Sequence, residues 1–160
     1  MLSDILALWH THDALNRYLL DNIPDGGLDA HPLLKTGKPS TGRSVARVFQ
    51  HIYDVRINHI PAAQRKLQLA DMPLIGKGDE PTRAQLELLL AGSGQAVAAQ
   101  LEAALTSNEL INKAHPLTYL GYLISHESHH RGQIVLALKQ SGFAPSEALR
   151  WGLWTKWWKA

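Results

Sequence analysis

A pair of histidines one helical turn apart is the feature of this sequence best suited to chemistry. His126 and His130 lie in the run Ser-His-Glu-Ser-His-His-Arg-Gly-Gln, from Ser125 to Gln133, inside a long apolar stretch that predicts a helix. Residues spaced i, i+4 lie one above the other on a single helix face. Two imidazoles on one face can hold a divalent metal, with Glu127 beside them. The segment therefore predicts part of a metal site.

A third ligand must come from elsewhere, because a catalytic zinc site usually has three protein ligands and one open position. His51 and His59 lie on a predicted helix whose apolar stripe centres on Val48, Ile52 and Val55. His59 falls within the stripe and His51 at its edge, so periodicity slightly favours His59 as the buried one. A position at the edge still suits a ligand at the rim of a cavity. The pattern alone does not choose between the two.

The sequence has nine histidines, its one compositional outlier, and the others have weaker claims as metal ligands. His129 sits about 100° from His130 around the helix and is predicted to face away, as a solvated or interface residue. His10 and His12 could reach the cavity from the first helix, where one would support the site or face a substrate. A surface role is at least as well supported for both. The remaining two histidines lie in predicted loops and carry no signal.

Glu127 has two interpretations. As a catalytic base it would polarise a metal-bound water. As a surface residue it would pair with Arg131 four residues later, in the favourable orientation, which contributes a few tenths of a kcal/mol. Nothing in the sequence chooses between them.

Length and composition narrow the class of protein. With 160 residues, of which 45% are hydrophobic, the chain predicts one globular domain, residues 1–160, with a real core. A formal net charge of +2 without a basic run gives no indication of nucleic-acid binding. There is no cysteine, which excludes disulfides, thiolate zinc sites and a cysteine nucleophile. Neither a secretory signal nor an uncharged apolar run of about 18 residues is seen, so we expect a cytoplasmic protein without a membrane span.

Four long helices are predicted to position these residues. They are expected at about Ser3–Asn22, from Thr41 or Ser44 to Pro61, from the capping box of Thr82 and Gln85 to about Leu105, and from Pro116 or Thr118 to Gly142. No segment shows convincing strand periodicity. The pattern predicts an all-α fold, a four-helix bundle with a short tryptophan-rich C-terminal appendage. Trp151 and Trp154 are expected to pack this appendage onto the bundle; the alternative is that its indoles cap a ligand pocket or form a dimer interface.

The run from His126 to His130 also satisfies the His-Glu-x-x-His pattern of zincin metallopeptidases. Its surroundings argue against that class. In the form with a third histidine, Gln133 stands at the glycine position and Leu136 at the histidine position. The form that takes a Glu ligand from a later helix has only Glu147 as a candidate, in a short segment. No upstream strand is predicted to align an extended peptide, so a zinc metallopeptidase is the lesser alternative.

Several segments together resemble the DinB/YfiT-like superfamily. In chain order they are Trp9 with Asn16–Leu20, Ser44–Val55 with its run His51-Ile52-Tyr53-Asp54-Val55, His126–Ile134, and Trp151–Trp154 after Gly142. In that family the motif ending in His-Arg-Gly-Gln lies on the last helix of a bundle, and a histidine starts a motif in the second helix. The resemblance spans nearly the whole chain in the right order, and the motif of the last helix is its most specific part.

That resemblance implies a four-helix bundle with a three-histidine site, in which His51 joins His126 and His130 to bind one divalent ion, zinc or nickel. Members of the family commonly dimerise, which implies a homodimer. Some are transferases or isomerases that use a small thiol such as mycothiol, bacillithiol or glutathione, and many have no known reaction. The Glu after the first histidine varies in the family, so a catalytic role of Glu127 is not carried over.

Three neutral imidazoles leave a bound metal with its full double charge, which lowers the pKa of zinc-bound water to about 7 and would equally deprotonate an incoming thiol. The expected function is therefore that of a metal-dependent hydrolase or a thiol-dependent transferase acting on a small molecule. Two alternatives stay open: a non-catalytic metal-binding or stress-response protein, and a structural dimer with vestigial histidines. Further side chains expected around the site are the pocket-wall candidates Trp9, His12 and Asn16, the orienting residue Asp54 one turn after His51, and Ser125 and Gln133 beside the histidine pair.

Overall fold

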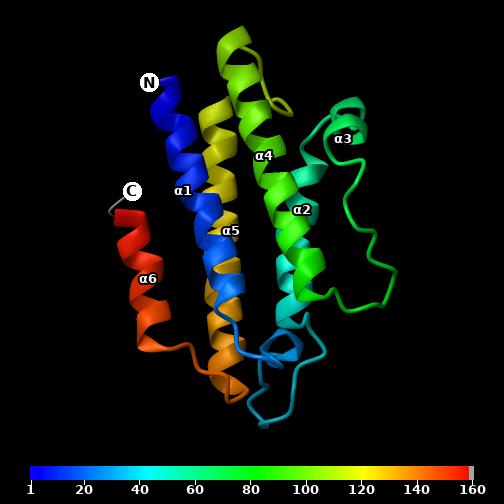
Figure 1. Ribbon diagram of the computed structural model, residues 1–160, viewed down its shortest axis with the longest axis vertical. Coiled ribbons are helices and arrows are strands. Elements are labelled where there is room, and N and C mark those ends of the chain that lie inside the picture. Colours follow the sequence, from blue (N-terminus) through cyan, green and yellow to red (C-terminus); the bar gives the residue numbers. More distant parts are fainter. Residues whose placement is uncertain (159–160) are drawn as a thin grey trace.

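The computed structural model describes residues 1–158, without the side chain of Leu67, and shows an all-helical protein (Figure 1). Its elements in chain order are α1 (Leu2–Asp21), the short 3-10 helix η1 (Gly27–Asp29), α2 (Val45–Asn58), α3 (Ala62–Gln68), α4 (Arg83–Ser107), α5 (Pro116–Gln140) and α6 (Glu147–Trp158). The predicted all-α class is confirmed. Residues 159 and 160 of the predicted domain lie outside the described residues.

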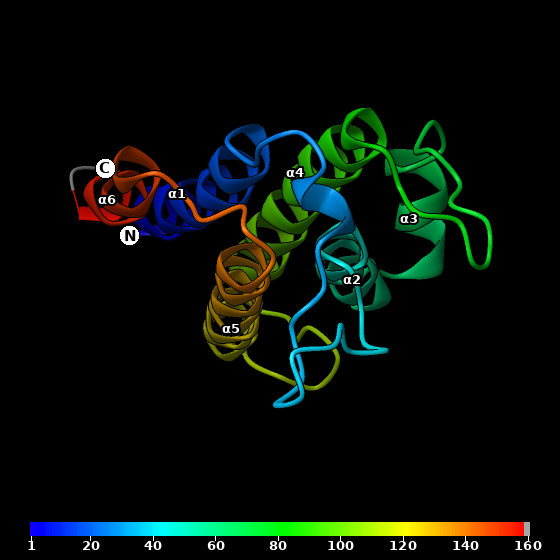
Figure 2. The ribbon, with the colours of Figure 1, turned by 90° about the horizontal axis from the view of Figure 1, so that it is seen from below.

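Helices α1, α4, α2 and α5 form the bundle and pack in that order around it, with α5 returning to α1. These are the four helices that the sequence predicts. Figure 2 shows α1 and α6 on one side of α5 and α2 on the other. Two further helices are not predicted: α3 begins directly after Pro61, and α6 runs beside α1.

Capping residues set the helix boundaries. The Ser44 hydroxyl accepts a backbone amide in the first turn of α2, and Thr82 with Gln85 forms the predicted capping box of α4. Pro116 stands in the first turn of α5, where its missing amide has no partner to lose. Gly142, with a φ of +84°, follows the end of that helix. The starts of α2 and α5 determine the height at which their histidines face each other.

Gly94 lets α1 approach α4 closely. Trp9 Nε1 donates a hydrogen bond to the Gly94 carbonyl at 2.8 Å. A Cβ at residue 94 would stand 2.6 Å from Asp13 Oδ1, which no side chain could tolerate without a shift. A glycine that weakens an isolated helix is therefore required by the packing of this one.

Two apolar clusters fill the bundle, and a polar layer separates them. One cluster includes Leu19, Ile52, Leu90 and Ile134, and the other includes Trp9, Ile60, Val97 and Leu123. Helices α1, α4 and α5 contribute buried residues to both clusters, whereas α2 contributes them to the first and Ile60, just after its end, belongs to the second. Buried polar residues lie between the two clusters. We call these residues the polar layer: His12, Asp13 and Asn16 of α1, Arg56 of α2, Ser93 of α4 and Glu127 of α5.

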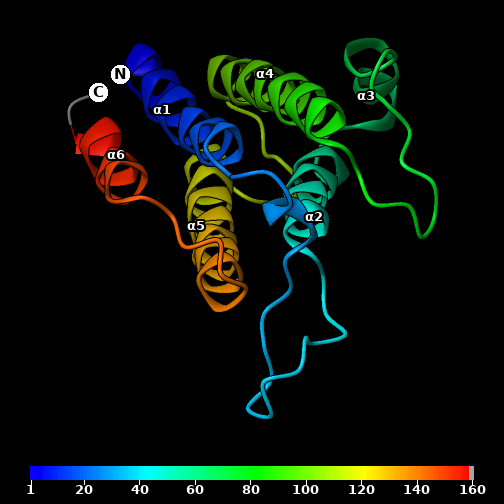
Figure 3. The ribbon, with the colours of Figure 1, turned by 60° about the horizontal axis from the view of Figure 1, so that its bottom comes forward.

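The C-terminal appendage is helix α6, which lies along α1 (Figure 3). Leu149, only 2% exposed, anchors it, and Leu153 one turn later packs against the same cluster. The prediction that Trp151 and Trp154 pack the appendage is wrong, since these side chains are 62% and 71% exposed. The buried stripe of α6 runs through the leucines, so these two indoles point elsewhere.

Among the described residues, α4 is the one helix long and apolar enough to cross a membrane. Its apolar residues fill the core, and the helix packs against both α1 and α2. That arrangement is typical of the central helix of a bundle.

Candidate metal centre

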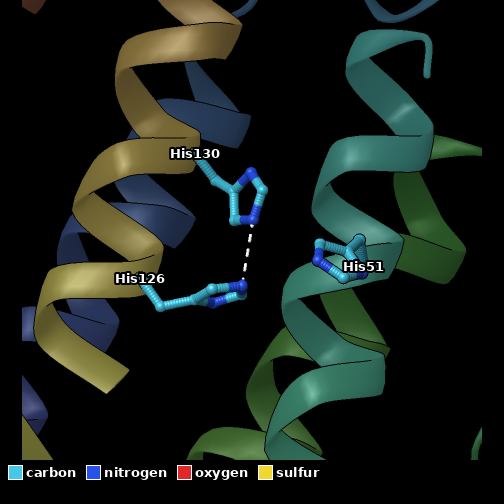
Figure 4. A group of neighbouring side chains, drawn as sticks. All are labelled: His51, His126 and His130. Atoms are coloured by element: carbon cyan, nitrogen blue, oxygen red, sulfur yellow. Dashed lines mark hydrogen bonds between the residues drawn. The ribbon is translucent and has the colours of Figure 1, made fainter. Parts of the chain in front are cut away.

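His51, His126 and His130 lie together between α2 and α5 (Figure 4). One ring nitrogen from each lies within 4.8 Å of those of the other two. The ring centroids are 4.4–5.3 Å apart. The Nε2 atoms of His126 and His130 are 3.0 Å apart. The structure thus brings together the i, i+4 pair of α5 and one histidine of α2.

His59 does not join this group. It follows the last residue of α2, and its Nδ1 lies 3.0 Å from the Asn112 side-chain nitrogen. Both His51 and His59 are half-buried, so burial does not separate them. Their positions along the helix axis separate them, because eight residues of helix place His59 about 12 Å beyond His51. His129 is exposed, as the sequence predicts, and is not one of the three clustered residues, although its ring lies 5.4 Å from that of His130.

Gln133 holds His130 in the tautomer that suits metal binding. The Gln133 side-chain oxygen accepts a hydrogen bond from His130 Nδ1 at 2.8 Å. The ring proton therefore sits on Nδ1, and the Nε2 lone pair faces His126. Gln133 Nε2 donates in turn to His129 Nε2 at 2.9 Å. Ser125, the other predicted neighbour, is exposed.

The three imidazoles are neutral at physiological pH. Burial, with a smaller contribution from Arg43, lowers the pKa of His51 to about 4. Burial also lowers the pKa of His126 and of His130, because it disfavours the charged form of an imidazole. Neutral imidazole is the form that ligates metals.

The residues present fit a divalent metal. Two nitrogens bound to one tetrahedral zinc stand about 3.3 Å apart, close to the 3.0 Å between the two Nε2 atoms here. Tyr122 stacks on the His126 ring, with centroids 5.5 Å apart, and so restricts its orientation. Within residues 1–158 the buried His126 Nδ1 has no hydrogen-bond partner, and its Nε2 contacts only His130 Nε2, a contact that a metal bound between the two rings would replace.

A cavity of about 500 Å³ opens beside His51. Arg43, Arg47 and Gln50 line it together with Asp54, the residue predicted to orient a ligand or substrate. Burial raises the pKa of Asp54, and the two arginines oppose that rise. The cavity therefore combines one metal-ligand candidate with two guanidinium groups and a carboxylate.

The other three pocket candidates lie in the protein interior. Trp9, His12 and Asn16 are fully buried. His12 Nε2 and Asn16 Nδ2 both bind Glu127 Oε2, at 2.8 and 2.6 Å, while Trp9 binds the carbonyl of Gly94. The polar residues of α1 face a carboxylate on α5 rather than a cavity. A substrate-facing role for these residues finds no support in the structure.

Glu127 is the centre of the polar layer. Arg56 binds it through two hydrogen bonds of 2.7 Å, Nε to Oε1 and Nη2 to Oε2, and both side chains are 0% exposed. Arg56 also pairs with Asp13 at 2.8 Å. Burial alone would raise the pKa of Glu127, but the attraction and hydrogen bonds of Arg56 outweigh it and hold this pKa well below its usual range.

Neither interpretation of Glu127 matches this arrangement. The surface pair with Arg131 is not formed, because Arg131 donates to Asn16 Oδ1 at 2.9 Å and to Ser128 Oγ at 2.7 Å. The catalytic-base interpretation finds no support either, since both oxygens of Glu127 are engaged by charged and polar partners.

Arg56 and Asp13 are two buried charged residues that the sequence patterns above do not predict. A signal for Arg56 exists, because it stands four residues after Ile52 on the buried face of α2. A charged side chain on an apolar face predicts a buried ion pair, since such residues are almost never fully buried without a partner.

One family model matches the chain, that of the DinB family, and it covers residues 1–158. No curated protein and no solved structure matches. The matched region includes both helices that carry the three histidines.

Proposed function

Because this chain belongs to the DinB family, we propose that it binds one divalent metal ion through His51, His126 and His130 and acts there on a small molecule. The proposed reaction is hydrolysis or transfer to a small thiol. One observation supports the metal site above all: three neutral imidazoles from two helices present ring nitrogens within 4.8 Å of one another. Zinc and nickel are the proposed metals, since imidazole suits both.

The bound metal would supply a Lewis acid that lowers the pKa of a coordinated water or thiol. The residues of the chain have separate tasks. Gln133 keeps the proton of His130 on Nδ1 and so keeps Nε2 free. Asp54 offers an acceptor in the cavity beside His51.

Arg43 gives the cavity its charge preference. Arg47 is engaged by Gln50 at 2.7 Å and by Glu80 at 3.6 Å. The described residues give the exposed Arg43 guanidinium no such partner. A small molecule carrying an anionic group is therefore the substrate class that this cavity favours.

Metal content tests the proposal. Untagged protein purified without chelators or nickel resin is analysed by elemental analysis for the wild type, His126→Ala and His129→Ala. His129 is a matched control, since it is an exposed histidine of the same helix that is not one of the three clustered residues. About one metal per chain in the wild type and in the control, lost in His126→Ala, is the expected result. No metal, and no uptake of added zinc or nickel, would refute the proposal.

Two further measurements refine it. His51→Ala should lose the metal and His59→Ala should keep it, which tests the third ligand. Metal-dependent consumption of glutathione in the presence of an electrophile such as 1-chloro-2,4-dinitrobenzene tests turnover. Stoichiometric metal without any thiol consumption or hydrolysis would favour the non-catalytic alternative. The homodimer and the cytoplasmic location stay predictions, and sedimentation velocity would test the first.

A further inference from the structure

A second cavity, of about 630 Å³, lies between α1, α5 and α6. Its volume is in the range of small-molecule sites. Gly132 lines it and follows His130 by two residues, about 200° around α5, so the cavity is on the opposite face of that helix from the three histidines. Figure 3 shows α1 and α6 on this side of α5 and α2 on the other.

The wall of this cavity is mainly apolar. Leu15 of α1 and Val135 of α5 face Leu153, Trp154 and Trp157 of α6 across it. Trp154 is 71% exposed, although indole is among the most favourable side chains to remove from water. A ligand with an apolar body would cover this surface.

Two guanidinium groups border the same space. Arg131 is half-buried, and its two hydrogen-bond acceptors, Asn16 Oδ1 and Ser128 Oγ, are both uncharged. Arg150 of α6 is the second cation. In the part of the chain that the structure describes, neither has a carboxylate within ion-pair distance, whereas Arg56 has two.

We propose that this cavity is a binding site for a carboxylate with an apolar body, such as a medium-chain fatty acid. The carboxylate would lie on Arg131 and Arg150, and the chain would lie against Trp154 and Trp157. A carboxylate on a half-buried guanidinium that has no ion-pair partner gains a charge-assisted, bidentate contact. The site is separate from the histidine cluster and does not depend on a metal.

Gly132 offers a direct way to block the cavity. An added Cβ there would meet no atom within 4 Å, and leucine is a better helix former than glycine. Gly132→Leu therefore places a side chain into the cavity without strain. Gly121 of the same helix is equally open and does not line the cavity, so Gly121→Leu is the matched control.

Calorimetric titration with decanoate tests the site, with 1-decanol as the neutral probe of equal length. Saturable binding of one decanoate per chain is expected, weakened at least tenfold in Gly132→Leu and unchanged in Gly121→Leu. Decanol should bind at least tenfold more weakly. Should Gly132→Leu not fold, the exposed Arg150→Glu variant should show the same loss of decanoate binding. Lys35→Glu makes the same change of charge on a distant exposed loop and should leave binding unchanged.

A metal at the histidine cluster would also attract a carboxylate, so His51→Ala separates the two sites. Decanoate binding that persists in His51→Ala and fails in Gly132→Leu supports the second site, whether or not the first binds metal. Binding that fails in His51→Ala, or under chelator, and persists in Gly132→Leu would overturn it. Absence of saturable binding, or equal binding of decanol, would also overturn it.

Discussion

His126 and Glu127 are neighbours in the sequence but belong to regions of opposite character. The histidine cluster is neutral, with His130 buried and the other two rings half-buried, and within the described residues His126 Nδ1 has no hydrogen-bond partner. The polar layer is buried and charged, and its carboxylate is bound by three different side chains. A buried charge whose partners all come from the chain itself is part of the fold, because removing one partner leaves the charge uncompensated. Three neutral imidazoles that converge beside a cavity indicate a site for an ion that the chain does not supply.

The contrast explains why the His-Glu-x-x-His pattern misleads here. In a zincin the two histidines and the glutamate serve one metal and one water. In this protein His126 and His130 of α5 lie next to His51 of α2, while Glu127 binds Arg56. The pattern predicts that the two histidines share one face of the helix. It does not predict the role of Glu127 between them, because that role depends on which side chains of other helices contact it.

The largest expected effect comes from breaking the polar layer. Glu127→Ala leaves the buried Arg56 with Asp13 as its sole carboxylate partner, and we expect a loss of about 3–5 kcal/mol in the free energy of unfolding. Urea denaturation of metal-free protein measures it. The control is Glu102→Ala, an exposed position of α4, which should change stability by less than about 0.5 kcal/mol. A loss below about 1 kcal/mol for Glu127→Ala would mean that the layer is not structural.

Unfolding measured with and without metal should show the contribution of the histidine cluster to stability. Zinc at 100 times its dissociation constant should raise the free energy of unfolding of the wild type by about 2.7 kcal/mol, because it binds the folded state alone. His126→Ala should show no such rise. Without metal, the two proteins should differ by less than about 1 kcal/mol, since His126 is half-buried and neutral. If metal-free His126→Ala lost as much stability as Glu127→Ala, the distinction between a metal-binding cluster and a structural polar layer would be wrong.

Gln133→Ala should weaken the metal site and spare the fold. Loss of the acceptor for His130 Nδ1 frees the tautomer, and such changes lower metal affinity by about 10- to 100-fold. Competition with a chromophoric chelator measures this affinity. Stability without metal should stay within about 0.5 kcal/mol, because Gln133 is exposed. The exposed neighbour Ser125→Ala should keep full affinity; an equal loss there would discount a specific role for Gln133.

The smallest expected loss of stability concerns the start of helix α2, which carries residues of both regions. Ser44→Ala removes the cap of the helix that carries both His51 and Arg56, and it should lower stability by about 1 kcal/mol. Thermal denaturation gives the loss and elemental analysis gives the metal content, which should stay at about one per chain. Thr41→Ala is the matched control, since the sequence offers Thr41 as the other candidate cap. An equal loss at Thr41 would contradict the observed start of α2.

Strong local signals predict most of the helices correctly. The capping box at Thr82, the proline at Pro116 and the glycine at Gly142 act within one turn of chain, so they can be recognised without the rest of the molecule. The seven residues of α3 show no comparable periodicity. The packing of α6 depends on which face meets α1, and the sequence alone favours its tryptophans over Leu149.

The third ligand shows a second limit. Periodicity gives the direction of a side chain around its helix but says nothing about the relative height of two helices. His51 and His59 differ mainly in that height, which depends on the start of α2 and on the pairing of Arg56 with Glu127. The resemblance to a family supplies what the periodicity lacks.

The polar layer also bears on how the bundle folds. Arg56 lies 43 residues from Asp13 and 71 residues from Glu127, and all three must meet before its charge is satisfied. A chain truncated before α5 would bury Arg56 with one carboxylate missing, or leave that part of the core open to water. No pair of helices is complete by itself, so we expect the four to fold and unfold as one cooperative unit.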